Sequence, residues 1–193
     1  MLIHKGTERL ETERLILRKF SVEDFKEVYE NWACEDKVTE FLTWASHKNP
    51  DETKRTLTGL VKNYKDNDFY NWAIELKGES KLVGNILIVN YRTETREANL
   101  EYCLGSKWWG QGIMPEAGMA VIKYLFEECG FNRIGADHDK DNPKSGRVMQ
   151  KLGMTYEGTL RKAGFSRRGI IDVVWYSILK DEWTGELKDF KPV

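Results

Sequence analysis

The sequence has few cysteines and no long apolar run. Its three cysteines, Cys34, Cys103 and Cys129, are an odd number at wide and irregular spacing, so they predict neither a disulfide framework nor a metal cage. No segment approaches the length of a membrane span, and residues 1–9 lack the apolar run of a signal peptide. These absences predict a soluble cytoplasmic protein with reduced thiols and no metal site.

The chain also lacks a net charge of either sign. Thirty Lys and Arg residues stand against thirty-one Asp and Glu residues, which gives a formal net charge of −1. Broad electrostatic attraction to nucleic acid or to an anionic membrane is therefore not expected. Any anion-binding site must be local.

What the chain does have is enough apolar material for one folded domain. Of its 193 residues, 40% are hydrophobic and 12% of all residues are aromatic. Such a composition offsets the entropy lost when the chain is ordered, and no repeat, Gly/Ser linker or low-complexity tract divides the sequence. We therefore predict a single domain over residues 1–193, with its core at about residues 10–183.

Apolar periodicity predicts a mixed α/β (α+β) order of elements. About seven segments have the alternation of strands, namely residues 15–20, 70–76, 82–91, 98–104, 133–139, 155–163 and 171–179. Helical spacing and capping residues predict about four helices, beginning near Ser21, Asn49, Gly112 and Asn142. A short helical or irregular stretch is expected at 37–44, and the strands within 70–104 are predicted to form an antiparallel meander.

The segment from Trp109 to Pro115 lies between a predicted strand and a predicted helix. Gly110 and Gly112 have no Cβ, so a ligand can approach the backbone amides of the loop closely. The positive end of the following helix then favours a pyrophosphate without any lysine cluster. A Gly-x-Gly turn alone is weak evidence, because the same turn also serves simply to enter a helix.

The arrangement around this loop resembles the GCN5-related N-acetyltransferases, and within them the branch that acetylates ribosomal-protein N-termini. The similar segments come in the same order over nearly the whole chain. They are Leu10–Arg18 with Asp24, Trp109–Ala117, Asn142–Ser145, Lys151–Met154, Glu157-Gly158 with Arg161, Gly169 with Asp172, and Tyr176–Leu179 with Glu182-Trp183. Lys107 stands where the family usually has Arg or Gln, a minor departure because the loop's backbone does the binding in that family.

The resemblance implies a central twisted, mostly antiparallel sheet that is splayed between the strand at 98–104 and the strand at 133–139. Acetyl-CoA is expected to lie in this V-shaped opening. The implied cofactor contacts come from the first of these strands, from the loop and from the start of the next helix. They are Tyr102, Cys103, Leu104, Trp109, Gly110, Gln111, Gly112, Ile113, Met114 and Asn142. Asn142 is, alternatively, simply a good helix N-cap.

Acylation of an amine needs a group that removes the ammonium proton. Alternation along residues 98–104 puts Asn99, Glu101 and Cys103 on one face of the strand. Related enzymes often use a glutamate on this strand as the general base, commonly through water, and the resemblance gives that role to Glu101. The alternative is a solvated carboxylate paired with a neighbouring Lys or Arg.

The departing thiolate needs a proton, and the tetrahedral oxyanion needs a hydrogen-bond donor. The resemblance implies Ser145 as the acid, although local helix capping is its alternative role. A backbone N–H near residues 102–104 is expected to bind the oxyanion. Because Cys103 has no His in local reach, direct transfer in a ternary complex is favoured over an acyl-cysteine. His138 is interpreted as structural.

The leading hypothesis is an acetyl-CoA-dependent N-acetyltransferase that acts on a protein N-terminal α-amine. Two alternatives stay open: acetylation of a small amine such as a polyamine, amino sugar or amino acid, and a non-catalytic acyl-CoA-binding module. If Arg167 and Arg168 line the cleft, they repel a polycation and favour peptides or anionic acceptors. The expected partners are acetyl-CoA and the acceptor, not nucleic acid or membrane, and a homodimer is common in the family.

Overall fold

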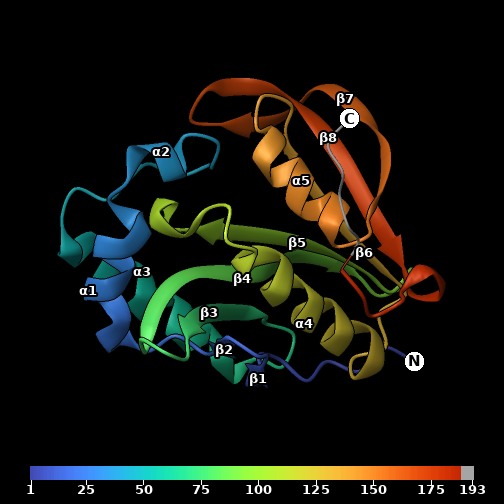
Figure 1. Cartoon of the computed structure of the whole chain (residues 1–193), viewed down its shortest axis with the longest axis horizontal. Coiled ribbons are helices and arrows are strands. Elements are labelled where there is room, and N and C mark those ends of the chain that lie inside the picture. Colours follow the sequence, from blue (N-terminus) through green and yellow to red (C-terminus); the bar gives the residue numbers. More distant parts are fainter. Residues whose placement is uncertain (188–193) are drawn as a thin grey trace.

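The computed structural model describes residues 1–187, so residues 188–193 of the predicted domain lie outside the described part. This part is centred on an eight-stranded sheet in the order β1-β2-β3-β4-β5-β6-β8-β7 (Figure 1). The strands are β1 Leu10–Glu11, β2 Leu15–Arg18, β3 Asn71–Leu76, β4 Lys81–Arg92, β5 Glu97–Leu104, β6 Arg133–Asp139, β7 Thr155–Ser166 and β8 Gly169–Leu179. The predicted mixed class is confirmed, and the periodicity missed only the very short β1.

The helices of the described part begin and end where the local sequence favours it. They are α1 Phe25–Val28, α2 Asp36–Thr39, α3 Pro50–Lys62, α4 Ile113–Glu127 and α5 Pro143–Lys151. At the start of α3, the Asn49 side-chain oxygen accepts a hydrogen bond from the Glu52 N–H at 3.1 Å. Gly130 and Gly153, with φ of 79° and 81°, follow α4 and α5 in the left-handed conformation that stops a helix.

The helix predicted from Ser21 is not continuous. Ser21 caps a 3-10 turn, the single turn of α1 follows, and a π-helical turn then covers Tyr29–Ala33. In the π turn, the buried Asn31 donates its side-chain amide to the Leu82 carbonyl at 2.7 Å. This long-range bond fixes the segment against the start of β4, and apolar periodicity gives no sign of it.

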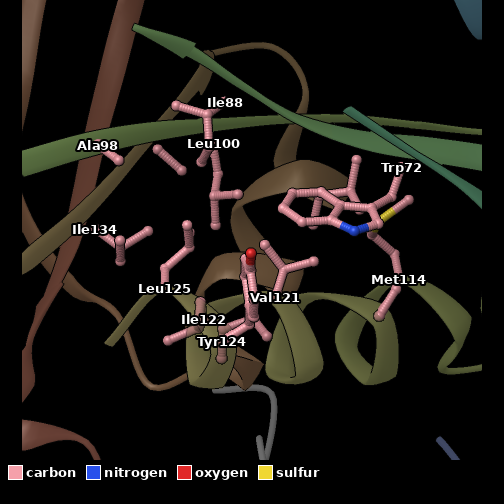
Figure 2. Close-up of a cluster of buried hydrophobic side chains, with 14 of the residues drawn as sticks. Trp72, Ile88, Ala98, Leu100, Met114, Val121, Ile122, Tyr124, Leu125 and Ile134 are labelled. Atoms are coloured by element: carbon pink, nitrogen blue, oxygen red, sulfur yellow. The ribbon is translucent and has the colours of Figure 1, made fainter. Parts of the chain in front are cut away.

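Apolar layers cover both faces of the sheet. Trp72 of β3 points into the layer beneath α4, together with Leu100 and Val121, and Figure 2 shows these side chains packed between the strands and the helix. The next residue, Ala73, points into the layer shared with α1 and α3. Burial of apolar surface on both faces, at about 25 cal/mol per Å², makes the sheet the rigid support for the residues at its strand ends.

The sheet opens between β5 and β6, the one parallel pair in the described sheet. Their pairing ends at Leu100 and Ala136, although β5 continues to Leu104 and β6 continues to Asp139. Beyond this point β5 stays paired with β4, and β6 stays paired with β8. The two halves of the sheet therefore diverge, as Figure 1 shows, and the splay expected from the resemblance is present.

The close approach of β4 to β5 depends on Gly84. A Cβ on Gly84 would lie 2.3 Å from the Cys103 carbonyl oxygen, which belongs to the backbone. We expect Gly84→Ala to lower the free energy of unfolding by about 2 kcal/mol, because the two strands must move apart. Gly59→Ala is the control: Gly59 lies in α3 with open space around it, so alanine should stabilise the helix by roughly 0.5–1 kcal/mol.

Urea unfolding followed by circular dichroism measures both variants. Equal stability of G84A and the wild type would contradict this account of the β4–β5 contact.

Candidate active site

The loop between β5 and α4 holds several backbone amides without a helical partner. Gly110 and Gly112 have φ of 78° and 76°, a left-handed conformation that glycine adopts without strain. The first backbone bond of α4 runs from the Glu116 N–H to the Gly112 carbonyl at 3.1 Å. The amides of Gly112, Ile113 and Met114 are therefore not used by the helix, and with its positive end they can bind an anion.

The turn between β1 and β2 fixes this loop in place. Glu116, in the first turn of α4, accepts hydrogen bonds from the Thr12 hydroxyl at 2.5 Å and from the Arg14 side chain at 2.6 Å. Arg14 also donates to the Gln111 carbonyl at 3.1 Å. Burial would raise the pKa of Glu116, but these bonds outweigh it and hold the pKa below its ordinary value.

A cavity of about 340 Å³ lies beside the loop. Gly112 and Pro115 form part of its wall, and two cationic side chains, Arg14 and Lys151, form another part. Because Arg14 is paired with Glu116, Lys151 is the cation of this wall that has no ion-pair partner in residues 1–187. Two carboxylates, Glu13 and Glu116, also line the cavity, so its wall carries charges of both signs.

Trp109 connects the end of β5 to the start of α5. Its indole N–H donates to the Leu104 carbonyl at 2.7 Å, and the Lys144 ammonium lies 4.6 Å from the centre of its ring. The Gln111 side chain donates to the Lys107 carbonyl at 2.9 Å, which braces the loop from within.

Beyond Leu100, β5 offers an unpaired backbone edge towards β6. The backbone groups of Tyr102 and Leu104 point to this edge, whereas those of Cys103 point to Asn85 of β4, and the Leu104 carbonyl already accepts the Trp109 indole N–H. A free strand edge can take up an extended ligand by backbone hydrogen bonds. The free edge of β5 and the loop that follows it are therefore both positioned to contact an extended ligand.

The Tyr102 hydroxyl bridges the opening to α5. It donates to the Ser145 carbonyl at 2.9 Å and lies 2.8 Å from the Ser145 hydroxyl. Burial raises the pKa of the Tyr102 phenol well above its ordinary value, so the phenol stays protonated. Asn142 occupies the N-cap position of α5, and its side chain makes no capping bond there.

Glu101 lies on the opposite face of β5, where the sheet has begun to open. The residue is exposed, yet partial burial of its carboxyl raises its pKa, and the charge of Asp137 raises that pKa further. The neighbouring Lys or Arg partner of the alternative interpretation is absent from residues 1–187. Burial also raises the pKa of the Cys103 thiol to about 12, so this thiol is not a ready nucleophile.

The tip of the β7–β8 hairpin reaches across to α2. Arg167 donates from its backbone to the Leu42 carbonyl at 2.9 Å and from its guanidinium to Asp36 at 2.9 Å. Arg168 pairs with Asp141 at 2.8 Å and with Asp139 at 3.3 Å. This contact joins the two halves of the sheet a second time.

The expectation that these two arginines repel a polycation applies only if they line the cleft, and both of them are paired with aspartates. Arg167 is neutralised by Asp36, and Arg168 by Asp139 and Asp141. Their charge therefore gives no reason to prefer an anionic acceptor.

His138 is a packing residue. Its ring is buried and stacks on Tyr176, and a Cβ on Gly146 would lie 2.6 Å from its Nε2 atom. Across residues 1–187, no group of three His, Cys, Asp or Glu side chains is arranged to hold a metal ion. No helix in the same span is long and apolar enough to cross a membrane.

A family description, the acetyltransferase (GNAT) domain, matches residues 14–155 of the chain. This span contains the loop, both strands of the opening and the start of α5. The chain belongs to the GNAT acetyltransferase family. GNAT enzymes use acetyl-CoA, so this acetyltransferase takes its acetyl group from acetyl-CoA, and the loop amides and the β5 edge fit that cofactor.

Relatives of this GNAT chain include enzymes that act on ribosomal proteins. The uncharacterized N-acetyltransferase YoaA of Bacillus subtilis is 29% identical over 89% of this chain and 96% of its own length. The [ribosomal protein uS5]-alanine N-acetyltransferase of Escherichia coli is 27% identical over 78% of this chain and 79% of its own length. The crystal structure of a GNAT acetyltransferase from Bacillus anthracis has a TM-score of 0.80 at 29% identity, covering 90% of this chain and 99% of that one.

Two features of this GNAT site were not predicted from the sequence. Asp137 lies opposite Glu101, and the Tyr102 hydroxyl contacts Ser145. Both depend on which residues of β5, β6 and α5 lie side by side, and the sequence of one strand does not contain that information. Alternation along β5 predicts the face to which Glu101 points. Alternation along β6 places Asp137 on the same face, but only when the register of β5 against β6 is known.

The loop geometry makes Gly112 a test of cofactor binding. At a φ of 76°, a Cβ costs about 1–2 kcal/mol, so we expect Gly112→Ala to raise the KM for acetyl-CoA about tenfold. Gly78→Ala is the control, because Gly78 lies in a turn with open space and no left-handed φ. Steady-state thiol release measures both variants, and an unchanged KM in G112A would contradict the role of the loop.

Proposed function

We propose that the protein acetylates a protein N-terminal α-amine by direct transfer from acetyl-CoA in a ternary complex. The observation that carries the proposal is the position of Glu101 and of the Tyr102–Ser145 pair on opposite faces of β5 at the open end of the sheet. An acetyl group held at the β5 edge would lie between a base and an acid. Similarity to the uS5-alanine N-acetyltransferase supports a protein N-terminus as the acceptor.

Glu101 is the proposed base, and it removes a proton from the acceptor ammonium directly or through one water. The base acts only when it is ionised, so the rate falls as the pH falls through its pKa. Burial and the charge of Asp137 raise that pKa, so the acidic limb of the rate profile lies at higher pH than the limb of an ordinary glutamate.

Ser145 is the proposed acid for the departing thiolate. Its hydroxyl lies in the first turn of α5, where the positive helix end stabilises negative charge on sulfur. Tyr102 orients this hydroxyl through the 2.8 Å contact. A backbone N–H at the β5 edge, that of Tyr102 or Leu104, stabilises the oxyanion without any side chain.

The cofactor's phosphates are proposed to lie on the loop. Trp109, Gly110, Gln111, Gly112, Ile113 and Met114 supply its backbone. The side chain of Asn142, which makes no capping bond, is proposed to contact the pantetheine arm. Acetyl-CoA when bound supplies the activated thioester.

A small amine is the second candidate acceptor. The pairing of Arg167 and Arg168 with aspartates removes the electrostatic objection to a small cationic amine.

We further propose a cytoplasmic location, which the three free cysteines support. The homodimer stays a prediction. We propose the β7–β8 hairpin as its interface, because four large apolar side chains are exposed there: Tyr156, Leu160, Phe165 and Ile170.

Thiol release from acetyl-CoA with a panel of short peptides tests the acceptor class. We expect release with peptides that have a free N-terminus and none with the same peptides blocked at the N-terminus. Spermidine, glucosamine and free amino acids form the comparison set. Release with these small amines alone would show that the protein-substrate proposal is wrong.

Replacing the base tests its role. We expect Glu101→Gln to lower kcat/KM about 100-fold and to remove the acidic limb of its pH profile, because the amide cannot take a proton. Glu94→Gln, an exposed glutamate in the β4–β5 turn, is the matched control and should behave as the wild type. A retained acidic limb in E101Q would assign the base to another residue.

Replacing the acid separates catalysis from capping. We expect Ser145→Ala to lower kcat roughly tenfold with little change in the KM for acetyl-CoA, and Tyr102→Phe to have a smaller effect of the same kind. Thermal unfolding of each variant is the control. A fall in melting temperature with an unchanged kcat would leave Ser145 as a capping residue only.

A further inference from the structure

Glu101 has a counterpart on the other half of the open sheet. The last paired residues of β5 and β6 are Leu100 and Ala136, so Glu101 and Asp137 are the next residue on each strand. Leu100 and Ala136 both point into the core beneath α4, and side chains alternate along each strand. Glu101 and Asp137 therefore point to the same face, opposite Tyr102, and both are exposed.

Neither of these carboxylates is neutralised by the protein. Within residues 1–187, Glu101 and Asp137 make no ion pair or side-chain hydrogen bond, whereas Asp139, two residues along β6, pairs with Arg168. Burial raises the pKa of both carboxyls, and the charge of Asp137 adds to the rise at Glu101. Two unpaired carboxylates at the end of a ladder attract a cation.

The charged groups around Glu101 and Asp137 do not offset the attraction of these two carboxylates for a cation. Asp139 is neutralised by Arg168 on the same face. From the α2 side, Glu35 accepts a hydrogen bond from Ser106 and pairs with Lys37 at 3.3 Å, and it acts on Cys103 rather than on Glu101. On β8, the residue paired with Asp137 is the uncharged Trp175, and on β4 the residue paired with Glu101 is Leu87.

We infer that Glu101 and Asp137 together bind the acceptor as a primary ammonium cation, Asp137 holding the ammonium while Glu101 takes its proton. The inference rests on the proposed amine acetylation. It adds that the acceptor enters the site in its protonated, positively charged form. An ammonium has three N–H donors, enough for both carboxylates at once.

The proton transfer balances within this pair. One N–H bond of the ammonium breaks, its proton joins the Glu101 carboxylate, and the nitrogen keeps the electron pair that attacks the thioester. The neutral amine remains hydrogen-bonded to Asp137 through a second N–H. Asp137 touches the acceptor but exchanges no proton, so it is a binding residue.

Asp137→Asn tests the inference, because asparagine keeps the size and removes the charge. We expect the acceptor KM to rise roughly tenfold, the typical loss for a hydrogen bond to a charged group, with the KM for acetyl-CoA unchanged. The acidic limb of the kcat/KM profile should move to lower pH, because the charge that raises the pKa of Glu101 is gone. Asp137→Glu keeps the charge and should restore most of the affinity.

Asp66→Asn is the matched control, since Asp66 is exposed in the turn before β3 and makes no side-chain bond in the described part.

A second measurement, of binding, does not require turnover. Calorimetry in the presence of CoA compares an acceptor with its analogue in which a hydroxyl replaces the amine. The wild type should prefer the amine, and D137N should lose most of that preference.

An unchanged acceptor KM together with an unmoved acidic limb in D137N would overturn the inference. The result is separable from the proposed protein substrate, because the same measurements apply to whichever amine the wild type accepts. If only small amines are acetylated, the protein-substrate proposal is wrong. A shift of the acidic limb of the kcat/KM profile in D137N, measured with such a small amine, still supports binding of the ammonium by Glu101 and Asp137.

Discussion

The end of the hydrogen-bonded ladder between β5 and β6 is the constraint on which the rest of the site depends. A continuous sheet would satisfy every backbone group of both strands, and no ligand could enter between them. Here β4 holds β5 and β8 holds β6, so each half stays ordered after Leu100 and Ala136 have made the last pair. Each backbone group left unpaired in a buried site costs about 1–3 kcal/mol, and a ligand that pairs with it recovers that cost.

Because side chains alternate along β5, the two faces of this strand carry groups that favour charges of opposite sign. On the side of α4 and α5 lie the positive helix ends, the glycine loop and the neutral Tyr102–Ser145 pair, all suited to developing negative charge. On the other side lie Glu101 and Asp137, suited to a cation. A single strand thus presents opposite chemistry on its two faces, and residues one position apart differ because their side chains point in opposite directions.

Much of this arrangement was predictable from the sequence, because strands and helix ends leave local signals. Seven of the eight strands follow from alternation, and Gly112 marks the start of α4. β7 extends beyond its predicted end because it is an edge strand with exposed residues on both faces, which gives no apolar alternation to read. Asp137 and the partners of Arg167 were not predictable, because they depend on strand register and on contacts between distant segments.

The contact between the β7–β8 tip and α2 has a topological consequence. Because Arg167 ties the tip to Asp36 and Leu42, and Ser106 after β5 donates to Glu35 before α2, contacts connect β5 through the α2 segment and the hairpin to β6. The two halves of the sheet are therefore connected twice, once by the β5–β6 ladder and once by this contact, so the width of the opening between them is fixed.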